Sequence, residues 1–314
     1  MESATLPALP GAPALKTGRA VARWIELVSW FFVAFGLLLP FVFHSAAFSL
    51  YRDALVRWAY GADSIAPADH ELFGLMLGIT GGSIAGKWIV HALLARGPLA
   101  EGRPWARDLS LRGLGAWFIL DSVASLAVGA TFNVWMINLL PLALVGMPLT
   151  AAYRSFDVRD DGAAGPGTAL ARACRWTALF GASTGLVIAF GGGTPAFALW
   201  FRALELAQYA GASIDESTRR AAMAFFGPIG GCTFAQFVML AGWIGHDRAL
   251  RRPAAAGAVS IAAWFAIDSG YGLASAGLFN ILMINVPALA VTLPPWAALC
   301  YRQRQAGPPR AAFD

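Results

Sequence analysis

Long apolar runs alternate with short polar segments along most of this chain of 314 residues. A membrane-spanning helix needs about 20 mostly apolar residues, because the hydrocarbon core is about 30 Å thick and a helix rises about 1.5 Å per residue. The pattern therefore predicts an all-α membrane protein with eight transmembrane helices. The predicted spans are 22–43, 72–95, 113–130, 132–152, 175–193, 221–245, 257–276 and 278–300.

The first apolar run follows Arg23 and ends near Ser45-Ala46-Ala47, a sequence that resembles a signal-peptide cleavage site. The run is too long for a secretory hydrophobic region, and further apolar runs follow it. We interpret it as the first membrane helix. Residues 1–20 are rich in Pro and Ala, and we expect them to form a disordered cytoplasmic segment.

Two of the polar segments, 44–70 and 194–220, are longer and contain aromatic residues at near-helical spacing. This spacing predicts short amphipathic helices in the outer membrane interface, although ordinary capping loops would also satisfy it. The residues concerned are Phe48, Tyr51, Leu55 and Trp58 in the first segment, and Phe197, Trp200, Phe201 and Leu204 in the second.

Basic residues are distributed unequally between the two sides of the predicted spans. The segments on the side of the N-terminus carry 17 Lys and Arg residues, and those on the other side carry 5. Because positive charge concentrates in cytoplasmic loops, both termini should be cytoplasmic. We therefore expect a multi-pass protein of the inner (plasma) membrane.

The second half of the chain repeats part of the first. Residues 116–138 and 263–285 are identical at 12 of 23 positions with a constant offset of 147. The glycine-rich stretches 78–83 and 227–232 correspond at an offset of 149. The matched polar and aromatic positions are Trp117 and Trp264, Asp121 and Asp268, Ser122 and Ser269, Asn133 and Asn280, and Asn138 and Asn285.

The repeat predicts two tandem four-helix units, at 21–153 and 175–301. Between and after them we expect a cytoplasmic linker at 154–174 and a tail at 302–314. Four is an even number of spans, so both units would insert with the same orientation, related by a parallel pseudo-two-fold axis along the membrane normal.

Ionisable residues inside a span are costly and usually face other helices or water. Lys87 and Asp121 are expected at similar depth on neighbouring helices, so we predict that they pair. In the second unit Gln236 stands where the first has Lys87, which leaves Asp268 without a matching cation. Apolar surroundings would then favour the neutral acid.

These residues form our candidate ligand or ion pathway: Asp121, Lys87, Asp268, Gln236, Ser122, Ser269, Asn138 and Asn285. An alternative is that the Asp residues only join helices through hydrogen bonds. Asn133 and Asn280 are interpreted as caps of the fourth helix of each unit. For Asn138 and Asn285, bonds across helices and a role in lining a cavity stay equally open.

Composition agrees with a membrane protein, because 58% of residues are hydrophobic and only 13% are charged. The net charge of +5 belongs to the loops and gives no indication of nucleic-acid binding. The three cysteines lie far apart, so we predict no disulfide framework and no metal site. Nucleotide-binding, metalloprotease, hydrolase and haem motifs are missing, and no cofactor is expected.

The stretches Gly81-Gly82-Ser83-Ile84-Ala85-Gly86-Lys87-Trp88 and Ala116-Trp117-Phe118-Ile119-Leu120-Asp121-Ser122 resemble a set of small bacterial four-helix membrane proteins without an assigned activity. Those proteins carry a similar G-x-x-x-G-W helix, followed by a W-[FY]-x-x-D-[ST] helix and a short hairpin that contains Asn. This chain looks like a duplicated version, so the resemblance implies a four-helix unit and no activity.

Three functional hypotheses follow. The first is a small-solute or ion transporter-like protein whose interior cavity reaches both Asp residues. The second is a membrane scaffold or accessory subunit without catalytic activity. The third is a lipid-modifying membrane enzyme, which needs a lipid-open pocket that contains Asp121 or Asp268. The expected partners are the lipid bilayer and a small solute, ion or lipid; the sequence leaves the oligomeric state open.

Overall fold

The computed structural model describes residues 12–61, 64–65, 67–156, 168–247 and 250–305, and within these ranges the secondary structure is helical throughout. The α-helices are α1 (Ala12–Phe43), α2 (Ser49–Tyr60), α3 (His70–Leu94), α4 (Pro104–Ala127), α5 (Thr131–Asn133), α6 (Leu139–Pro141), α7 (Met147–Ala151), α8 (Ala169–Phe190), α9 (Pro195–Gln208), α10 (Glu216–His246), α11 (Arg251–Ala274), α12 (Leu278–Asn280) and α13 (Val286–Gln305). Four π-helical segments join some of these helices: η3 (Ala95–Leu99), η4 (Val134–Asn138), η5 (Leu142–Gly146) and η8 (Ile281–Asn285).

Seven helices in the described residues are long and apolar enough to cross a membrane. The prediction of an all-helical membrane protein is therefore confirmed. The span predicted at 257–276 corresponds to most of α11. This helix has 24 residues and is not among the seven. Serine, glycine and Asp268 dilute the apolar content of α11.

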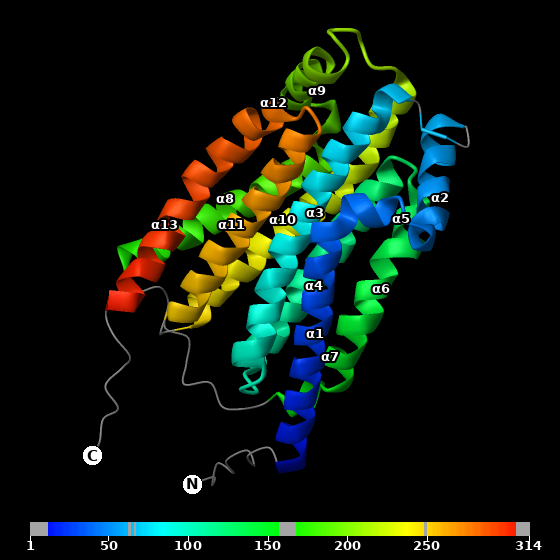
Figure 1. The fold of residues 1–314 in the computed structure, drawn as a ribbon. Coiled ribbons are helices and arrows are strands. Elements are labelled where there is room, and N and C mark those ends of the chain that lie inside the picture. Colours follow the sequence, from blue (N-terminus) through cyan, green and yellow to red (C-terminus); the bar gives the residue numbers. More distant parts are fainter. Residues whose placement is uncertain (1–11, 62–63, 66, 157–167, 248–249, 306–314) are drawn as a thin grey trace, which may run out of the picture.

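Two helices, α3 and α10, form the centre of the bundle (Figure 1). In the apolar stretch of α3, 83% of residues are buried, and in that of α10, 72% are. In the span Leu278–Gln305, by contrast, only 22% of the apolar stretch is buried. The outer helices expose large apolar side chains such as Leu27, Phe41 and Trp176. In a soluble protein such surfaces would drive aggregation, but in a bilayer they face lipid.

The helices pack in a pattern that interleaves the two halves of the chain. Helix α3 packs against α1 and α11, α10 packs against α8 and α4, and α3 and α10 also contact each other. A Cβ atom on Gly82 would lie 3.1 Å from the Asp268 Cβ atom, and one on Gly231 would lie 3.1 Å from the Asp121 Cβ atom. Each glycine of α3 or α10 thus lets the Asp-bearing helix of the other half approach closely.

A polar contact joins the beginnings of α3 and α10. Asp69 is 3% exposed and accepts hydrogen bonds from the Tyr209 hydroxyl at 2.7 Å and from the Thr218 hydroxyl at 3.0 Å. Because the first half supplies the carboxyl group and the second supplies both donors, this contact holds the two halves together at one end of the bundle.

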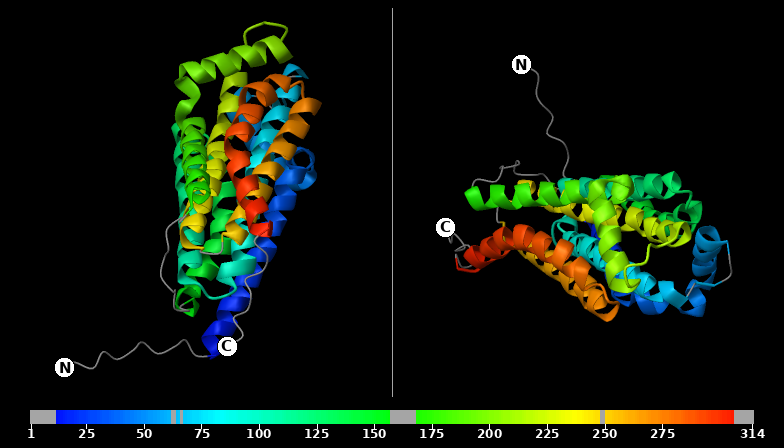
Figure 2. Two further views of the ribbon diagram at one scale, coloured as in Figure 1. Left: turned by 90° about the vertical axis from the view of Figure 1, so that its left-hand side faces the viewer. Right: turned by 90° about the horizontal axis from the view of Figure 1, so that it is seen from above.

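Short helices occupy both of the longer outer segments, as predicted. Helix α9 lies across the end of the bundle, and α2 flanks the bundle near α5 (Figure 2). Helix α8 ends at Phe190, and the turn Gly191–Gly193 leads directly to Pro195 at the start of α9. The glycine run therefore terminates this helix.

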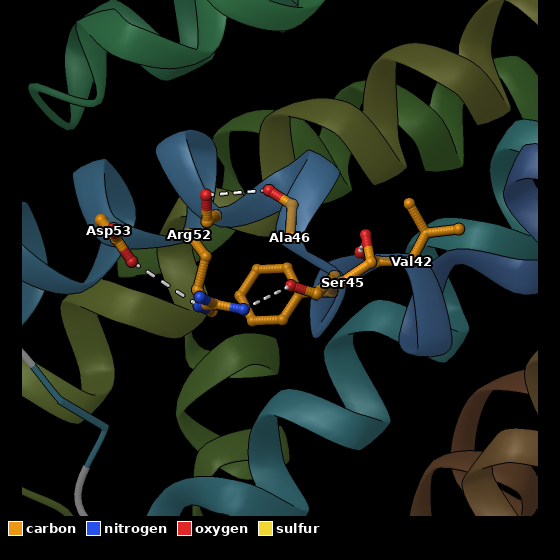
Figure 3. A network of polar contacts seen from close by, with 7 residues as sticks. Val42, Ser45, Ala46, Arg52 and Asp53 are labelled. Carbon is orange, nitrogen blue, oxygen red and sulfur yellow. Dashed lines mark hydrogen bonds and ion pairs between the residues drawn. The ribbon is translucent and has the colours of Figure 1, made fainter.

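Arg52 ties the end of α1 to α2 (Figure 3). Its Nη1 atom donates to the Phe43 carbonyl oxygen at 3.2 Å, and its Nε atom lies 3.6 Å from Asp53 Oδ1. Ser45 Oγ donates to the Val42 carbonyl oxygen at 2.6 Å. These contacts satisfy carbonyl groups that a helix end leaves without partners.

The first described helix begins and the last one ends at the same end of the bundle (Figure 1). We expected residues 1–20 to be disordered, but α1 begins at Ala12, so residues 12–20 are helical. Residues 1–11 lie outside the described residues, as do 157–167 of the expected linker and 306–314 of the expected tail.

Candidate functional site

Asp121 is buried in the last third of α4 and belongs to a polar cluster. Its Oδ1 atom accepts hydrogen bonds from Ser125 Oγ at 3.1 Å and Asn133 Nδ2 at 2.9 Å, and Asn133 also donates to Ser125 Oγ at 2.9 Å. Asn138 donates to Ser122 Oγ at 3.2 Å. These bonds join α4 to α5 and η4, and they compensate for removing the polar groups from water.

Asp268 occupies the matching position on α11 and is 1% exposed. Its Oδ1 atom accepts hydrogen bonds from Asn280 Nδ2 at 3.2 Å and from Asn285 Nδ2 at 2.9 Å. Asn285 also donates to Ser269 Oγ at 3.1 Å. The structure thus brings Asp268, Ser269 and Asn285 together, just as it groups Asp121 with Ser122 and Asn138.

The π-helical segments η4 and η8 explain how two asparagines reach one carboxyl group. A π-helix bonds residue i to i+5, which places residues five apart on one face. Asn133 directly precedes η4 and Asn138 ends it, and Asn280 and Asn285 bear the same relation to η8. Both members of each pair are buried and face the neighbouring helix.

Asn133 and Asn280 were expected to cap their helices, and this prediction is wrong. The capping positions are Ala130 and Gly277, whereas both asparagines lie inside the helix and donate to the buried Asp. The physical reason is that a buried carboxyl group needs hydrogen-bond donors, and the third residue after the cap is within its reach.

Side chains from α2 and α9 form hydrogen bonds with these two asparagines. The Tyr51 hydroxyl of α2 donates to Asn133 Oδ1 at 3.3 Å, and Trp200 Nε1 of α9 donates to Asn280 Oδ1 at 3.1 Å. Burial, and next the negative charge of Asp121, raise the pKa of the Tyr51 phenol above its ordinary value, so the phenol keeps its proton and remains a donor. Each outer helix therefore orients one Asn toward an Asp.

Lys87 does not form the predicted pair with Asp121. Its Nζ atom is fully buried, has no hydrogen-bond partner, and lies 4.1 Å from the centre of the Trp88 ring and 3.8 Å from that of Trp117. Helices α3 and α4 run in opposite directions and make few contacts with each other. Lys87 and Asp121 each lie in the last third of their own helix, so they are offset along the bundle. Electrostatic attraction still acts between them.

Gln236, which replaces Lys87 in the second half, is buried and donates to Ser260 Oγ at 3.3 Å. This bond reaches α11 about two turns before Asp268. The hydrogen bonds described for Asp268 all reach Oδ1, from asparagines of its own half.

A cavity lies beside Asp268. It has a volume of about 70 Å³, enough for several water molecules. Its polar lining comes from Ser83, Thr184, Thr233, Gln236, Asp268, Asn280 and Thr292. An adjoining space of about 190 Å³ shares Thr184, Ile188 and Ile284 with it and extends beneath Phe197 and Trp200 of α9.

The combined space, which we call the Asp268 groove, opens sideways between α8 and η8. Phe180, Val187 and Ile284 line it, and 52%, 53% and 39% of their surfaces are exposed. Trp296 Nε1 donates to Thr177 Oγ1 at 3.3 Å, one turn beyond the groove on both α13 and α8, and closes that side. The groove is therefore a lateral recess with a polar floor.

Large side chains occupy the corresponding place in the first half. At an offset of 149, Phe32 and Phe35 of α1 stand where α8 has Gly181 and Thr184. The Phe32 ring stacks on Trp88 at 4.5 Å between ring centres, and it contacts Phe35 edge-on at 6.5 Å. The first half thus carries large aromatic rings at the two positions that line the groove in the second half.

The sequence prediction missed the donors Asn133, Asn280, Tyr51 and Trp200 as site residues. The signal was present, because all four are aligned polar or aromatic positions of the repeat. It also did not assign Gly181 and Thr184 to the site, because these positions differ between the halves.

No family model matches the chain, and no curated protein or solved structure matches it significantly.

Proposed function

We propose that this chain is a transporter-like membrane protein that binds a small amphipathic molecule in the Asp268 groove. One observation carries the proposal: a recess with a buried carboxyl group on its floor opens through an apolar rim toward the surface that would face lipid. Ligand sites are typically apolar cavities with a few converging polar groups. A molecule dissolved in the bilayer can enter such a site sideways.

The proposal includes the full architecture of two four-helix units with α11 as the eighth span. In support, α11 packs lengthwise between α3 and α13, and Gly82 and Gly231 approach the two Asp positions in the same way. The equivalent bonds of Tyr51 and Trp200 give further support. With eight spans, the distribution of basic residues favours cytoplasmic termini in the inner membrane.

The groove differs from the original transporter hypothesis in one respect. That hypothesis expected a cavity at both Asp residues, whereas the described cavities reach only Asp268. We therefore assign ligand binding to the second half and a structural role to the Asp121 cluster.

Substituting Thr184 by Phe tests the proposal, because Thr184 lines both parts of the groove and Phe is the residue found at the matching position, Phe35. The neighbouring Ser183→Phe variant is the control: Ser183 is exposed, and both hydroxyls merely bond to the Phe180 carbonyl oxygen. Binding of hexylamine, 1-hexanol and hexanoate is measured by calorimetry in lipid nanodiscs. At least one probe should bind the wild type and Ser183→Phe but not Thr184→Phe; binding of no probe, or equal binding by both variants, would overturn the proposal.

A second candidate is an enzyme that acts on a membrane-dissolved substrate with Asp268 as an acid or base. The lipid-open position of Asp268 favours it, because that was the feature such an enzyme requires. Vesicles of total bacterial lipid, incubated with the wild type or Asp268→Asn and compared by mass spectrometry, distinguish it from a carrier. A product that depends on Asp268 would identify an enzyme, and identical lipid profiles would exclude this candidate.

A further inference from the structure

The first half contains a buried ammonium group in an environment that can be traced residue by residue into the second half. The Lys87 Nζ atom lies over the rings of Trp88 and Trp117, with Asp121, Cys232 and His91 near it. A desolvated cation over two aromatic faces gains about 2 kcal/mol or more from the ring quadrupoles. This arrangement binds an ammonium without any hydrogen bond to it.

Four neighbours of that ammonium have equivalents that line the Asp268 cavity, whereas the equivalent of the fifth, His91, is Leu240, which does not line it. At the offsets of the repeat, Trp88 corresponds to Phe237, Trp117 to Trp264, Cys232 to Ser83 and Asp121 to Asp268. The second half therefore keeps two aromatic rings, a small polar residue and a carboxyl group around the place where the first half has its cation.

What the second half lacks is the cation itself. Gln236 stands in place of Lys87 and bonds to Ser260, away from Asp268. The described residues that line the cavity include no Lys or Arg. The described lining of the cavity therefore offers Asp268 no positive charge to pair with, and a bound cation would favour its ionised form.

We propose that the ligand of the Asp268 groove is an organic amine, whose ammonium group occupies the place held by Lys87 in the first half. This inference rests on the proposed function and adds the class of ligand to it. The ammonium pairs with Asp268 and lies against Trp264 and Phe237. In this proposal, the Lys87 ammonium group of the first half corresponds to the ammonium group of the ligand bound in the second half.

The rest of the groove is suited to an apolar body on the same molecule. The adjoining space under α9 is lined by Ile188, Phe197, Phe226 and Ile229, among others. An alkyl or aryl group could occupy it while the ammonium lies at Asp268. An anionic head group is disfavoured, because it would meet a carboxyl group and no cation.

Probes with one six-carbon body and three head groups test this inference. Hexylamine, 1-hexanol and hexanoate are titrated into nanodiscs that contain the wild type, Asp268→Asn, Trp264→Leu or the control Ser183→Phe, with empty nanodiscs subtracted. We expect hexylamine to bind the wild type and Ser183→Phe at least about tenfold more tightly than hexanol, equivalent to about 1.4 kcal/mol. Asp268→Asn should abolish this preference, and Trp264→Leu should reduce it.

The outcomes separate the two proposals. Binding of hexanol or hexanoate with equal or greater affinity than hexylamine would overturn the amine inference and leave the groove as a binding site. An amine preference that persists in both Asp268→Asn and Trp264→Leu would also overturn it. Absence of binding by all three probes would overturn both. Should Asp268→Asn fail to fold, Trp264→Leu and Thr184→Phe still decide the matter.

Discussion

At the scale of single residues, the two halves solve one electrostatic problem differently. Both bury an Asp whose Oδ1 atom accepts bonds from asparagine. The first half adds its own cation, Lys87, and fills the remaining space with Phe32 and Phe35. The second half removes the cation and these rings. A buried charge without compensation is costly, so the open half has the stronger demand for a ligand.

Removing the lysine should expose this relation. We expect Lys87→Ala to lower stability by about 2–4 kcal/mol, because it deletes a buried stem and leaves a cavity. Propylamine should restore part of the loss by placing an ammonium between Trp88 and Trp117, and 1-propanol should not. The measurement is thermal unfolding in detergent, with the Thr184→Phe substitution present in both proteins so that the second groove is closed. Equal rescue by the alcohol would contradict the explanation.

At the scale of helices, close glycine contacts determine which pairs pack. A Cβ atom on Gly185 of α8 would lie 2.5 Å from the Phe234 backbone nitrogen of α10, and one on Gly36 of α1 would lie 2.6 Å from the Gly81 carbonyl oxygen of α3. Neither Gly185 nor Gly36 can be replaced by a residue with a Cβ atom unless a helix moves. They hold α1 and α8 in equivalent positions, and only the side chains beside them differ.

Gly185→Ala should therefore destabilise the protein by about 1–3 kcal/mol, the usual range for overpacking. Gly115→Ala is the matched control, because it lies within α4 and a Cβ atom there would meet nothing within 4 Å. Its stability should stay the same or rise slightly, since Ala favours helix formation over Gly. Denaturation curves of the two variants provide the comparison, and equal loss in both would contradict the packing argument.

The start of α10 makes a prediction about pH. Asp215 Oδ1 accepts bonds from the Thr218 backbone N–H at 2.7 Å and the Ser217 hydroxyl at 2.8 Å, and the Thr218 bond is the main cause that lowers the Asp215 pKa. The cap should contribute about 1 kcal/mol, fully present above the unfolded-state pKa of about 3.9 and lost as the pH falls through the lower folded-state pKa.

Asp215→Ala should therefore be less stable than the wild type by a constant amount above about pH 5, with a difference that shrinks below about pH 4. Asp215→Asn keeps the capping oxygen and serves as the control, with most of the stability retained. Unfolding midpoints across this pH range measure the effect. A difference that grows on acidification would show that another group is responsible.

At the scale of the whole molecule, the sequence predicted more of the fold than of the site. Apolar run length gave the helices, and aromatic spacing gave α2 and α9. The marginal helix, α11, was also predicted from its apolar run, and the repeat supports it. The Lys87–Asp121 pair failed because helices adjacent in sequence were assumed to pack, whereas α4 packs against α10 instead. Run length and spacing carry no information about such long-range neighbours.

The groove could not be predicted from either half alone. It depends on the absence of a large side chain at Gly181 and Thr184, and a small residue in one helix does not predict a cavity until the neighbouring helices are known. At the offset of 149, Phe32 and Phe35 stand at the matching positions of the first half.

Anomalous diffraction from crystals soaked with 6-bromohexylamine tests the central claim most directly, because the bromine reports where the amine lies. The account predicts one strong bromine peak in the Asp268 groove, beside Thr184 and Ile284, and none beside Phe35 in the first half. A peak of equal strength in both halves, or no peak in the groove, would contradict it.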